Sequence, residues 1–224
     1  MPRRTSHVAV IAASLAACLV VAGSLRAQSP EATLERASDA WAKVNTARAT
    51  FEQTITNSIT GTSATARGTF EQQRPGKLAI RFDEPDGGRI VSDGKVVWIY
   101  LPASAPGQVV KRSSRDAGAM PIDITNQLLA DPRGKYTVSD AGAATISGRA
   151  AHGLILVPKA GTDAAFTRAT VWVDDADALI RQFEVVEPSG ITRRVRITSL
   201  ALNVPVSRQA FTFTPPKGVK IVER

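Results

Sequence analysis

The fold is decided by residues 77–101, which read KLAIRFDEPDGGRIVSDGKVVWIYL. Apolar residues alternate with polar or small ones in Lys77–Phe82, the pattern of a strand with one apolar face. Val96–Leu101 is apolar on both faces. The turn-forming segments Pro85-Asp86-Gly87-Gly88 and Asp93-Gly94 separate the runs closely. Strands joined by such short turns pair in antiparallel fashion, because parallel strands need long crossovers. The stretch therefore predicts an antiparallel sheet.

Runs with the same period of two continue on both sides of this stretch. The other runs in the first half are Phe51–Ile59, Ala66–Gln73 and Arg89–Ser92. Those in the second half are Tyr136–Asp140, Thr145–Arg149, Ala151–Val157, Phe166–Asp174, Ile180–Glu187 and Ile191–Ala201. Between the halves, Pro102–Met120 is rich in Gly, Ser, Ala and basic residues and is expected to be a long loop. No internal repeat or linker divides the chain, so a single β-rich domain is predicted.

Two segments have helical rather than strand periodicity. Glu31–Asn45 places apolar residues three and four apart, and Ile122–Leu129 follows Pro121 as a short apolar helix that ends before Asp131-Pro132. A sheet with a strongly apolar face must be covered by helices, close into a barrel, or hold an apolar ligand. Two short helices can complete an ordinary core or cover a binding cavity, and periodicity leaves both possibilities open.

The N-terminus is typical of a secretory signal peptide. Arg3 and Arg4 precede the apolar run Val8–Val21, and Ala22–Ala27 is rich in small residues. We expect cleavage after Ala27, which divides the chain into a signal peptide, residues 1–27, and a mature domain, residues 28–224. An alternative is Leu15-Ala16-Ala17-Cys18, which fits the acylation signal of a bacterial lipoprotein. The apolar residues directly after Cys18 favour the first interpretation, because polar linkers usually follow an acylated cysteine.

Composition excludes several classes of protein. The 224 residues are 43% hydrophobic and 21% charged, which is typical of a globular protein and not of a disordered one. The formal net charge is +8, but removal of residues 1–27 leaves 25 basic against 20 acidic residues. This excess is too mild to predict nucleic-acid binding. The mature chain would contain no cysteine, which excludes disulfides and thiolate metal ligands.

Catalytic motifs are scarce, so we do not expect an enzyme, a cofactor or a metal. The mature chain has one histidine, His152, inside an apolar strand, where a structural role is typical. Ser92-Asp93-Gly94-Lys95 matches the spelling of a serine–lysine catalytic pair, but that pair works on a helix and this segment is predicted to be a hairpin turn. The sequence contains no nucleophile elbow and no phosphate-binding glycine loop.

Two charged clusters are interpreted as surface features. Asp174-Asp175-Ala176-Asp177 lacks the glycine and the distal glutamate of a calcium loop and is predicted to be a polar turn. Arg193-Arg194-Val195-Arg196 lies in a strand, so its side chains divide between two faces, and no aromatic residues are interleaved with it. We therefore interpret this basic run as a solvated outer surface.

A family resemblance rests on several motifs that occur in one order. Phe51-Glu52-Gln53, Gly68-Thr69-Phe70, Arg74-Pro75-Gly76-Lys77-Leu78, Val91-Ser92-Asp93-Gly94-Lys95 and the closing Phe211-Thr212-Phe213-Thr214-Pro215-Pro216-Lys217-Gly218-Val219 resemble the LolA family of periplasmic lipoprotein carriers. The resemblance extends over residues 31–222. It implies an unclosed antiparallel half-barrel, mainly β, whose concave apolar face is covered by short helices that act as a lid.

The resemblance also implies a function and its partners. A carrier of this family takes acylated lipoproteins from an inner-membrane ABC transporter, crosses the periplasm and passes them to an outer-membrane acceptor of the LolB kind. We expect a monomer in the periplasm that binds no nucleic acid. Two other functions stay open: a membrane-anchored LolB-like receptor if Cys18 is acylated, and a periplasmic binder of another lipid such as phospholipid.

Particular residues acquire expected roles from the same resemblance. Arg74, beside Pro75, matches the arginine that holds the lid closed through backbone carbonyls, and its five donors suit that role. The acyl-chain cavity is expected to be lined by Leu78, Ile80, Phe82, Val97, Ile99, Leu128 and Leu129. Some family members carry aromatic residues at the positions of Leu78 and Ile80, so an aromatic lining must come from other positions here.

Overall fold

A computed structural model describes residues 29–83, 87–114 and 124–223 of the chain. Within these ranges the strands are β1 (Thr46–Asn57), β2 (Ser63–Gln73), β3 (Lys77–Phe82), β4 (Arg89–Asp93), β5 (Val96–Tyr100), β6 (Gln108–Ser113), β7 (Tyr136–Ile146), β8 (Arg149–Pro158), β9 (Arg168–Asp174), β10 (Ile180–Val186), β11 (Ile191–Leu202) and β12 (Lys220–Glu223). The helices are α1 (Pro30–Ala42), α2 (Ile124–Leu129), α3 (Pro132–Lys135) and the 3₁₀-helix η3 (Arg208–Phe211).

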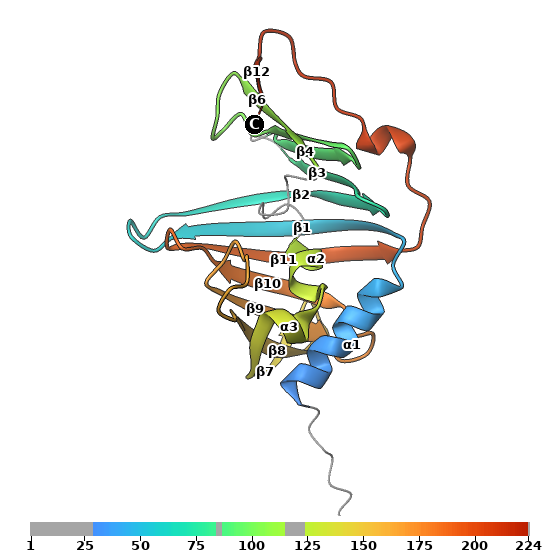
Figure 1. Cartoon of the computed structure of the whole chain (residues 1–224), viewed down its shortest axis with the longest axis vertical. Coiled ribbons are helices and arrows are strands. Elements are labelled where there is room, and N and C mark those ends of the chain that lie inside the picture. The colour runs from blue at the N-terminus through green and yellow to red at the C-terminus, as the bar shows by residue number, and fades with distance from the viewer. Residues whose placement is uncertain (1–28, 84–86, 115–123, 224) are drawn as a thin grey trace, which may run out of the picture.

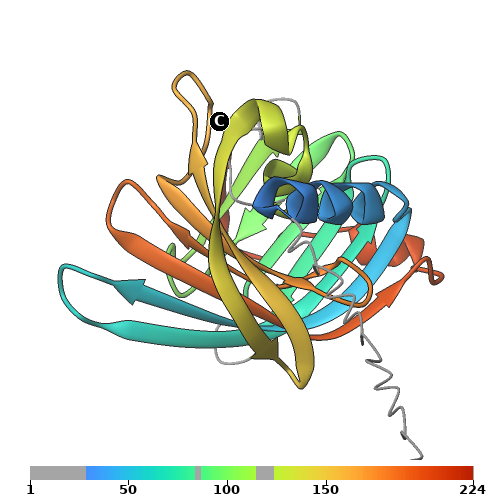
Figure 2. The same cartoon turned by 90° about the horizontal axis from the view of Figure 1, so that it is seen from below.

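All of these strands belong to one sheet, in the order β12-β6-β5-β4-β3-β2-β1-β11-β10-β9-β8-β7. The pairs are antiparallel except for β12 with β6, and the two outermost strands, β12 and β7, do not pair with each other. The sheet is therefore curved but unclosed. Figures 1 and 2 show α1 and α2 on its concave side. The predicted fold class, an unclosed antiparallel half-barrel with short covering helices, is confirmed.

Some strands differ from the expectations. Strand β6 lies inside Pro102–Met120, which was expected to be a loop, although residues 115–123 lie outside the described part. Strand β7 is continuous where two strands, Tyr136–Asp140 and Thr145–Arg149, were expected. A register shift between Asp140 and Gly142 lets pairing with β8 continue past the point where the periodicity breaks. The parallel strand β12 is possible because the long segment after β11 returns along the sheet and supplies the required crossover (Figure 1).

Helix α1 begins at a clear capping site that the sequence interpretation did not use. The Ser29 hydroxyl accepts a hydrogen bond from the Ala32 amide, and Pro30 occupies the first turn, where its missing amide donor costs nothing. The helix ends at Ala42 rather than at Asn45, because the chain turns there into β1. Residues 124–129 of the second predicted helix, Ile122–Leu129, are present as α2, and residues 122–123 lie outside the described ranges.

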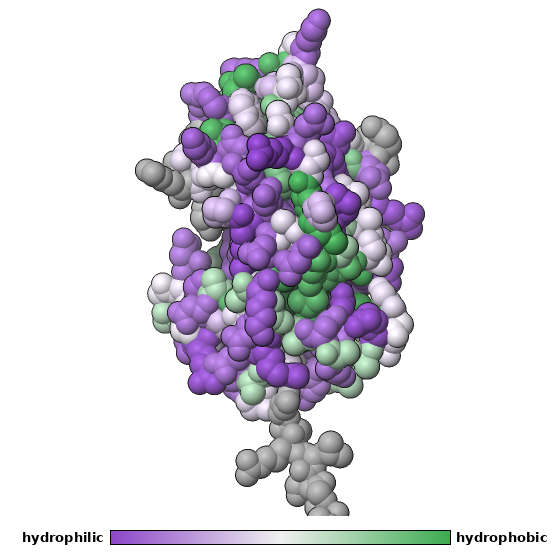
Figure 3. All heavy atoms as spheres, turned by 90° about the vertical axis from the view of Figure 1, so that its right-hand side faces the viewer, coloured by the Kyte–Doolittle hydropathy of each residue, from purple (hydrophilic) through white to green (hydrophobic). Residues whose placement is uncertain are grey.

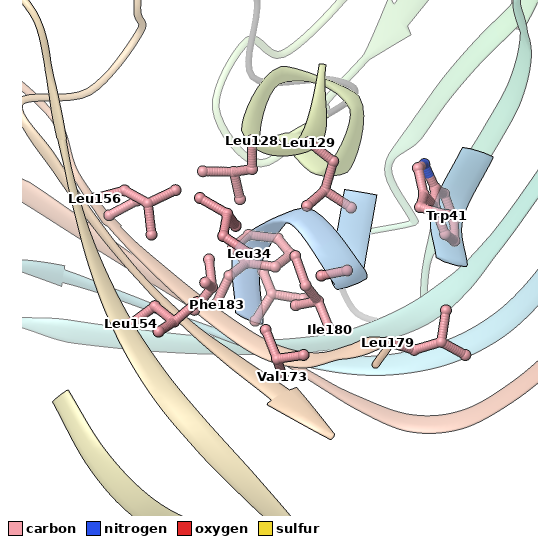
Figure 4. Close-up of a cluster of buried hydrophobic side chains, with 14 of the residues drawn as sticks. Leu34, Trp41, Leu128, Leu129, Leu154, Leu156, Val173, Leu179, Ile180 and Phe183 are labelled. Carbon is pink, nitrogen blue, oxygen red and sulfur yellow. The ribbon is translucent and has the colours of Figure 1, made fainter. Parts of the chain in front are cut away.

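The main core lies under α1 and α2, against strands β7 to β10. Leu34 of α1 and Leu128 of α2 are almost completely buried against leucines of β8 (Figure 4). The largest fully buried side chains of this cluster are Leu34, Leu128, Leu154, Leu156, Val44, Val171, Val173 and Val185. The helices are thus anchored toward one edge of the sheet, and the cavity described below lies over the middle strands and those toward the other edge.

The outer face of the sheet is covered by the segment that follows β11. Phe211 of η3 packs on Ala79 and Val91, and the Ala210 carbonyl accepts a hydrogen bond of 2.6 Å from Arg81. Further along, the Phe213 ring lies 5.8 Å from that of Trp98. Side chains of β3 to β5 that face away from the concave side are therefore buried as well, which explains why β5 is apolar on both faces.

The acidic run at residues 174–177 forms the turn between β9 and β10, as predicted. Asp174, however, is 1% exposed and ion-paired with Arg149 and Arg181. Burial alone would raise the pKa of its carboxyl, but hydrogen bonds from Arg149, the Ala176 amide and Arg181 together bring this pKa well below its usual range. Asp174 is therefore ionised at neutral pH and links three strands, β8, β9 and β10.

Neither a metal cluster nor a membrane-spanning helix occurs in the described ranges. No group of three or more potential metal ligands occurs among these residues, and none of their helices has the length and apolar character needed to cross a membrane. His152 contacts Asp140 of the neighbouring strand at 2.8 Å, a position consistent with a structural role. Ser92 and Lys95 flank the β4–β5 turn, in which Asp93 Oδ1 accepts from the Lys95 amide at 2.7 Å.

Candidate binding cavity

A cavity of about 370 Å³ lies between the concave face of the sheet and the helices α1 and α2. Its volume is in the range of about 300–1,000 Å³ that is typical of sites for small apolar ligands. The lining is predominantly apolar and comes from β1 to β5, β10, β11, the two helices and the segment after β5. The arrangement can remove an apolar ligand from water, and no nucleophile–base pair occurs among the described residues that line it.

Strand register explains why the lining is continuous. One apolar residue from each of six adjacent strands occupies the same row across the sheet, and each is paired with the next. From β5 to β11 the row is Ile99, Ile90, Ile80, Phe70, Ala49 and Leu200. Because side chains alternate along a strand, every second residue extends the surface in the strand direction. An extended apolar floor results, suited to hydrocarbon rather than to a compact polar metabolite.

Aromatic side chains contribute much of this surface. Trp41, Phe51, Phe70, Phe82 and Phe183 line the cavity. The rings of Phe51 and Phe82 meet edge to face, with centroids 5.7 Å apart and an interplanar angle of 89°. The structure thus supplies an aromatic lining from positions other than Leu78 and Ile80.

The residues predicted to line the cavity separate into two groups. Ile80, Phe82, Ile99 and Leu129 line it. The other three, Leu78, Val97 and Leu128, do not line it in this structure.

The second group shows why a shared face does not guarantee a place in the lining. Leu78 and Val97 point to the concave side, but both pair with Ser92. They therefore lie in the row next to that of Ile80 and Ile99, where they are 5% and 3% exposed. Leu128 points into the core beside Leu34 and Leu156. Periodicity identifies the face, but the position of the lid decides which part of that face bounds the cavity.

Apolar surface also reaches the outside at one end of the molecule. Figure 3 shows a hydrophobic band on the end where β1 begins and β11 ends. Cavity-lining residues from the same end are Trp41 in the last turn of α1, Ala49 early in β1 and Leu200 late in β11. The apolar lining of the cavity therefore extends to this end of the molecule.

Arg74, the residue expected to hold the lid, contacts the C-terminal end of α1. Its Nη1 donates a hydrogen bond of 3.0 Å to the Ala42 carbonyl at the C-terminal end of α1, and its guanidinium lies 6.0 Å from the centroid of the Trp41 ring. The Arg74 amide donates to the Asn45 carbonyl at 2.8 Å, which fixes the strand end beside the helix. The last carbonyls of a helix lack partners within the helix, and this end of the helix dipole is negative. A cation there is favoured both by hydrogen bonding and by the dipole.

Further contacts hold the two lid helices together. Trp41 Nε1 donates to Asn126 Oδ1 at 3.1 Å, and the Ser38 hydroxyl donates to the Leu129 carbonyl at 2.7 Å. Glu35 of α1 forms an ion pair with Arg133 of α3. Because Trp41 and Leu129 both line the cavity, α1 and α2 form one connected cover.

The basic run at residues 193–196 is not wholly an outer surface, which corrects the interpretation of this segment. Arg194 and Arg196 face outward and pair with Glu184 and Glu52. Arg193 instead lines the cavity, where its Nη1 donates to Gln53 Oε1 at 3.1 Å. The strand alternation contained the signal: Arg193 shares a face with Val195, which is buried.

Comparison with known proteins agrees with this geometry. The family described as "Outer membrane lipoprotein carrier protein LolA" matches residues 42–214. The chain belongs to the LolA family. The family resemblance noted in the sequence is thus confirmed.

The matches extend over most of the chain. A protein of Dechloromonas aromatica named outer-membrane lipoprotein carrier protein is 27% identical over 180 residues, which cover 79% of this chain and 81% of the relative. A protein of the same name from Serratia proteamaculans is 29% identical over 181 residues, covering 80% and 82%.

A solved structure supports the fold alone. An uncharacterized conserved protein from Thermus thermophilus superposes with a TM-score of 0.54 at 13% sequence identity, covering 87% of this chain and 98% of that protein. The shared architecture extends over almost the whole of the compared protein.

Proposed function

We propose that this member of the LolA family is a periplasmic carrier that binds the acyl chains of lipoproteins released from the inner membrane and delivers them to the outer membrane. The observation that carries the proposal is the continuous apolar floor under a lid that Arg74 holds at one end. The names of the relatives, which are lipoprotein carriers, support the class of cargo.

The energetics explain why such a carrier needs a closable cavity. Burying hydrocarbon yields about 0.8 kcal/mol per methylene, so ten methylenes contribute about 8 kcal/mol. An acylated protein therefore leaves a membrane only if another apolar surface receives its chains. A cavity of about 370 Å³ is at the small end of ligand sites, so we expect the lid helices to move apart when long acyl chains enter.

The proposal includes a location and partners. A signal peptide cleaved after Ala27 would deliver the mature chain to the periplasm, although residues 1–28 lie outside the described part. An inner-membrane lipoprotein-releasing ABC transporter would supply the cargo, and a LolB-like acceptor in the outer membrane would receive it where one is present. The carrier acts by binding rather than by catalysis, as a monomer, and does not engage nucleic acid.

A release assay tests this function. Purified residues 28–224 are added to inner-membrane vesicles that hold a labelled lipoprotein and an energised releasing transporter. We expect labelled lipoprotein to appear in the soluble fraction and to co-elute with the carrier at equal stoichiometry. A protein of similar size and charge that lacks an apolar cavity is the control and should release nothing. Retention of all label in the membrane would contradict the proposal.

A further inference from the structure

Among the described residues that line the cavity, one carries a charge, and it lies at the end away from Arg74. Arg193 of β11 pairs with Ile55 of β1, and its neighbours in the lining include Phe183 and Val195. Leu200, at the opposite end of the floor, is seven residues further along the same strand, which corresponds to roughly 20 Å. The described lining is therefore predominantly apolar, and its one charged group lies near one end.

The hydrogen-bonding capacity of Arg193 is only partly used. Its Nη1 donates to Gln53 Oε1 at 3.1 Å, and its Nη2 is 3.4 Å from Glu187 Oε1, a long contact for a charged pair. Its Nε is buried and has no hydrogen-bond partner among the described residues. This nitrogen is closed to a ligand. The two N–H groups of Nη1 and Nη2 that these contacts leave unused belong to a side chain that is 25% exposed and lines the cavity.

The surroundings of Arg193 indicate which acceptor it would bind. A guanidinium offers only donors, so the ligand must bring an oxygen. The Glu187 carboxylate lies 3.4 Å from Arg193 Nη2, so a phosphate placed at Arg193 would also lie near that carboxylate. A neutral carbonyl oxygen avoids this repulsion. The outward-facing Arg194 and Arg196, by contrast, each form a short ion pair with a glutamate, which leaves them no comparable role.

We propose that Arg193 binds the carbonyl oxygen of an acyl ester, and so places the glycerol end of the lipid at the β1–β11 pair near Ile55 while the hydrocarbon extends toward Trp41 and Leu200. This inference rests on the proposed function and adds the orientation of the ligand and the chemical group that is recognised. It gives Arg193 a positioning role: the residue selects an esterified lipid over bare hydrocarbon and fixes which end lies where.

A pair of matched lipids tests the proposal. One is a synthetic diacylglyceryl-cysteine lipopeptide with two ester-linked chains, and the other is its dialkyl ether analogue of the same chain length, which has no ester carbonyl. Binding of both is titrated by displacement of a fluorescent fatty acid. We expect Arg193→Leu to weaken binding of the ester lipopeptide about tenfold, in line with the loss of one hydrogen bond from a charged donor, and to leave the ether analogue within about twofold.

The control is Arg194→Leu, which removes the same charge from the same strand on the outer face and should change neither affinity. Thermal unfolding verifies that each variant is folded. Arg193→Lys keeps the charge beside Glu187 and replaces the leucine variant if that variant does not fold. It should lose less affinity than Arg193→Leu, and only for the ester lipopeptide.

Three other results of these titrations would contradict the role of Arg193, its preference for an ester carbonyl, or the proposed function. Equal weakening of the ester and ether lipopeptides by Arg193→Leu would reduce Arg193 to a packing role and overturn the proposal. A larger loss for a monomeric short-chain phosphatidylglycerol than for the ester lipopeptide would assign a phosphate instead, and would also overturn it. Failure of the unaltered protein to bind either lipopeptide would contradict the proposed function itself, and the inference with it.

Discussion

Replacing Arg74 with leucine is expected to leave the protein folded and able to bind acyl chains, but to slow transfer of cargo to an acceptor about tenfold. The guanidinium stabilises the closed lid through its 3.0 Å hydrogen bond to the Ala42 carbonyl. A hydrogen bond to a charged group contributes about 1.5 kcal/mol, and each 1.4 kcal/mol is a tenfold change in equilibrium. Without this hydrogen bond the open, loaded form becomes more populated relative to the closed, empty form. Closure of the lid then no longer favours release of the cargo.

The measurement is transfer of a labelled lipoprotein from the loaded carrier to acceptor-containing vesicles. Arg67→Leu is the matched control, because Arg67 is an exposed arginine on β2 that pairs with Glu52 on the outer face. This control should transfer at the normal rate. A normal rate for Arg74→Leu as well would show that the contact with α1 is only structural, and the latch would have to be abandoned.

A carboxylate placed in the cavity is expected to abolish carriage. Ile197 of β11 lines the cavity and is only partly buried, so the protein should tolerate Ile197→Asp as a folded chain whose cavity stays hydrated. Acyl binding would then require burial of an unpaired charge against hydrocarbon, which costs several kcal/mol. We expect the affinity for a diacylated lipopeptide to fall at least about 100-fold, which corresponds to about 3 kcal/mol.

The next residue supplies the control. Thr198 is exposed and does not line the cavity, and Thr198→Asp introduces the same charge one position along the strand. Its affinity should stay within twofold of that of the unaltered protein, and thermal unfolding of both variants separates loss of binding from loss of fold. Undiminished binding by Ile197→Asp would show that the acyl chains lie somewhere other than this cavity.

Strands were predictable where the alternation of polarity and the flanking turn residues indicate the same element. Lys77–Phe82 has alternating polarity and is bounded by strong turn residues, and strand β3 occupies those residues without change. Strand β6 was missed because Gln108–Ser113 has only two strongly apolar residues and depends on pairing with β5 and the distant β12. Pairing over such a distance in the sequence leaves little trace in local periodicity.

The site was predictable to a smaller extent, for a related reason. Alternation assigns Leu78 and Ile80 to one face correctly, but only Ile80 lies under the cover that α1 and α2 provide. The position of Arg74 beside the lid followed from the family resemblance and not from the residues themselves. Arg193 was interpreted with its outward-facing neighbours, although its shared face with the buried Val195 indicated the cavity.

The most direct test of the account is a native mass spectrum of the protein isolated from periplasm without detergent. We expect the mass of residues 28–224, with part of the population carrying a diacylated or triacylated lipoprotein in a one-to-one complex. A phospholipid adduct in place of lipoprotein would contradict the assigned cargo and indicate a binder of another lipid. Recovery only from membranes, with Cys18 acylated, would contradict the central claim and make this protein an anchored receptor rather than a carrier.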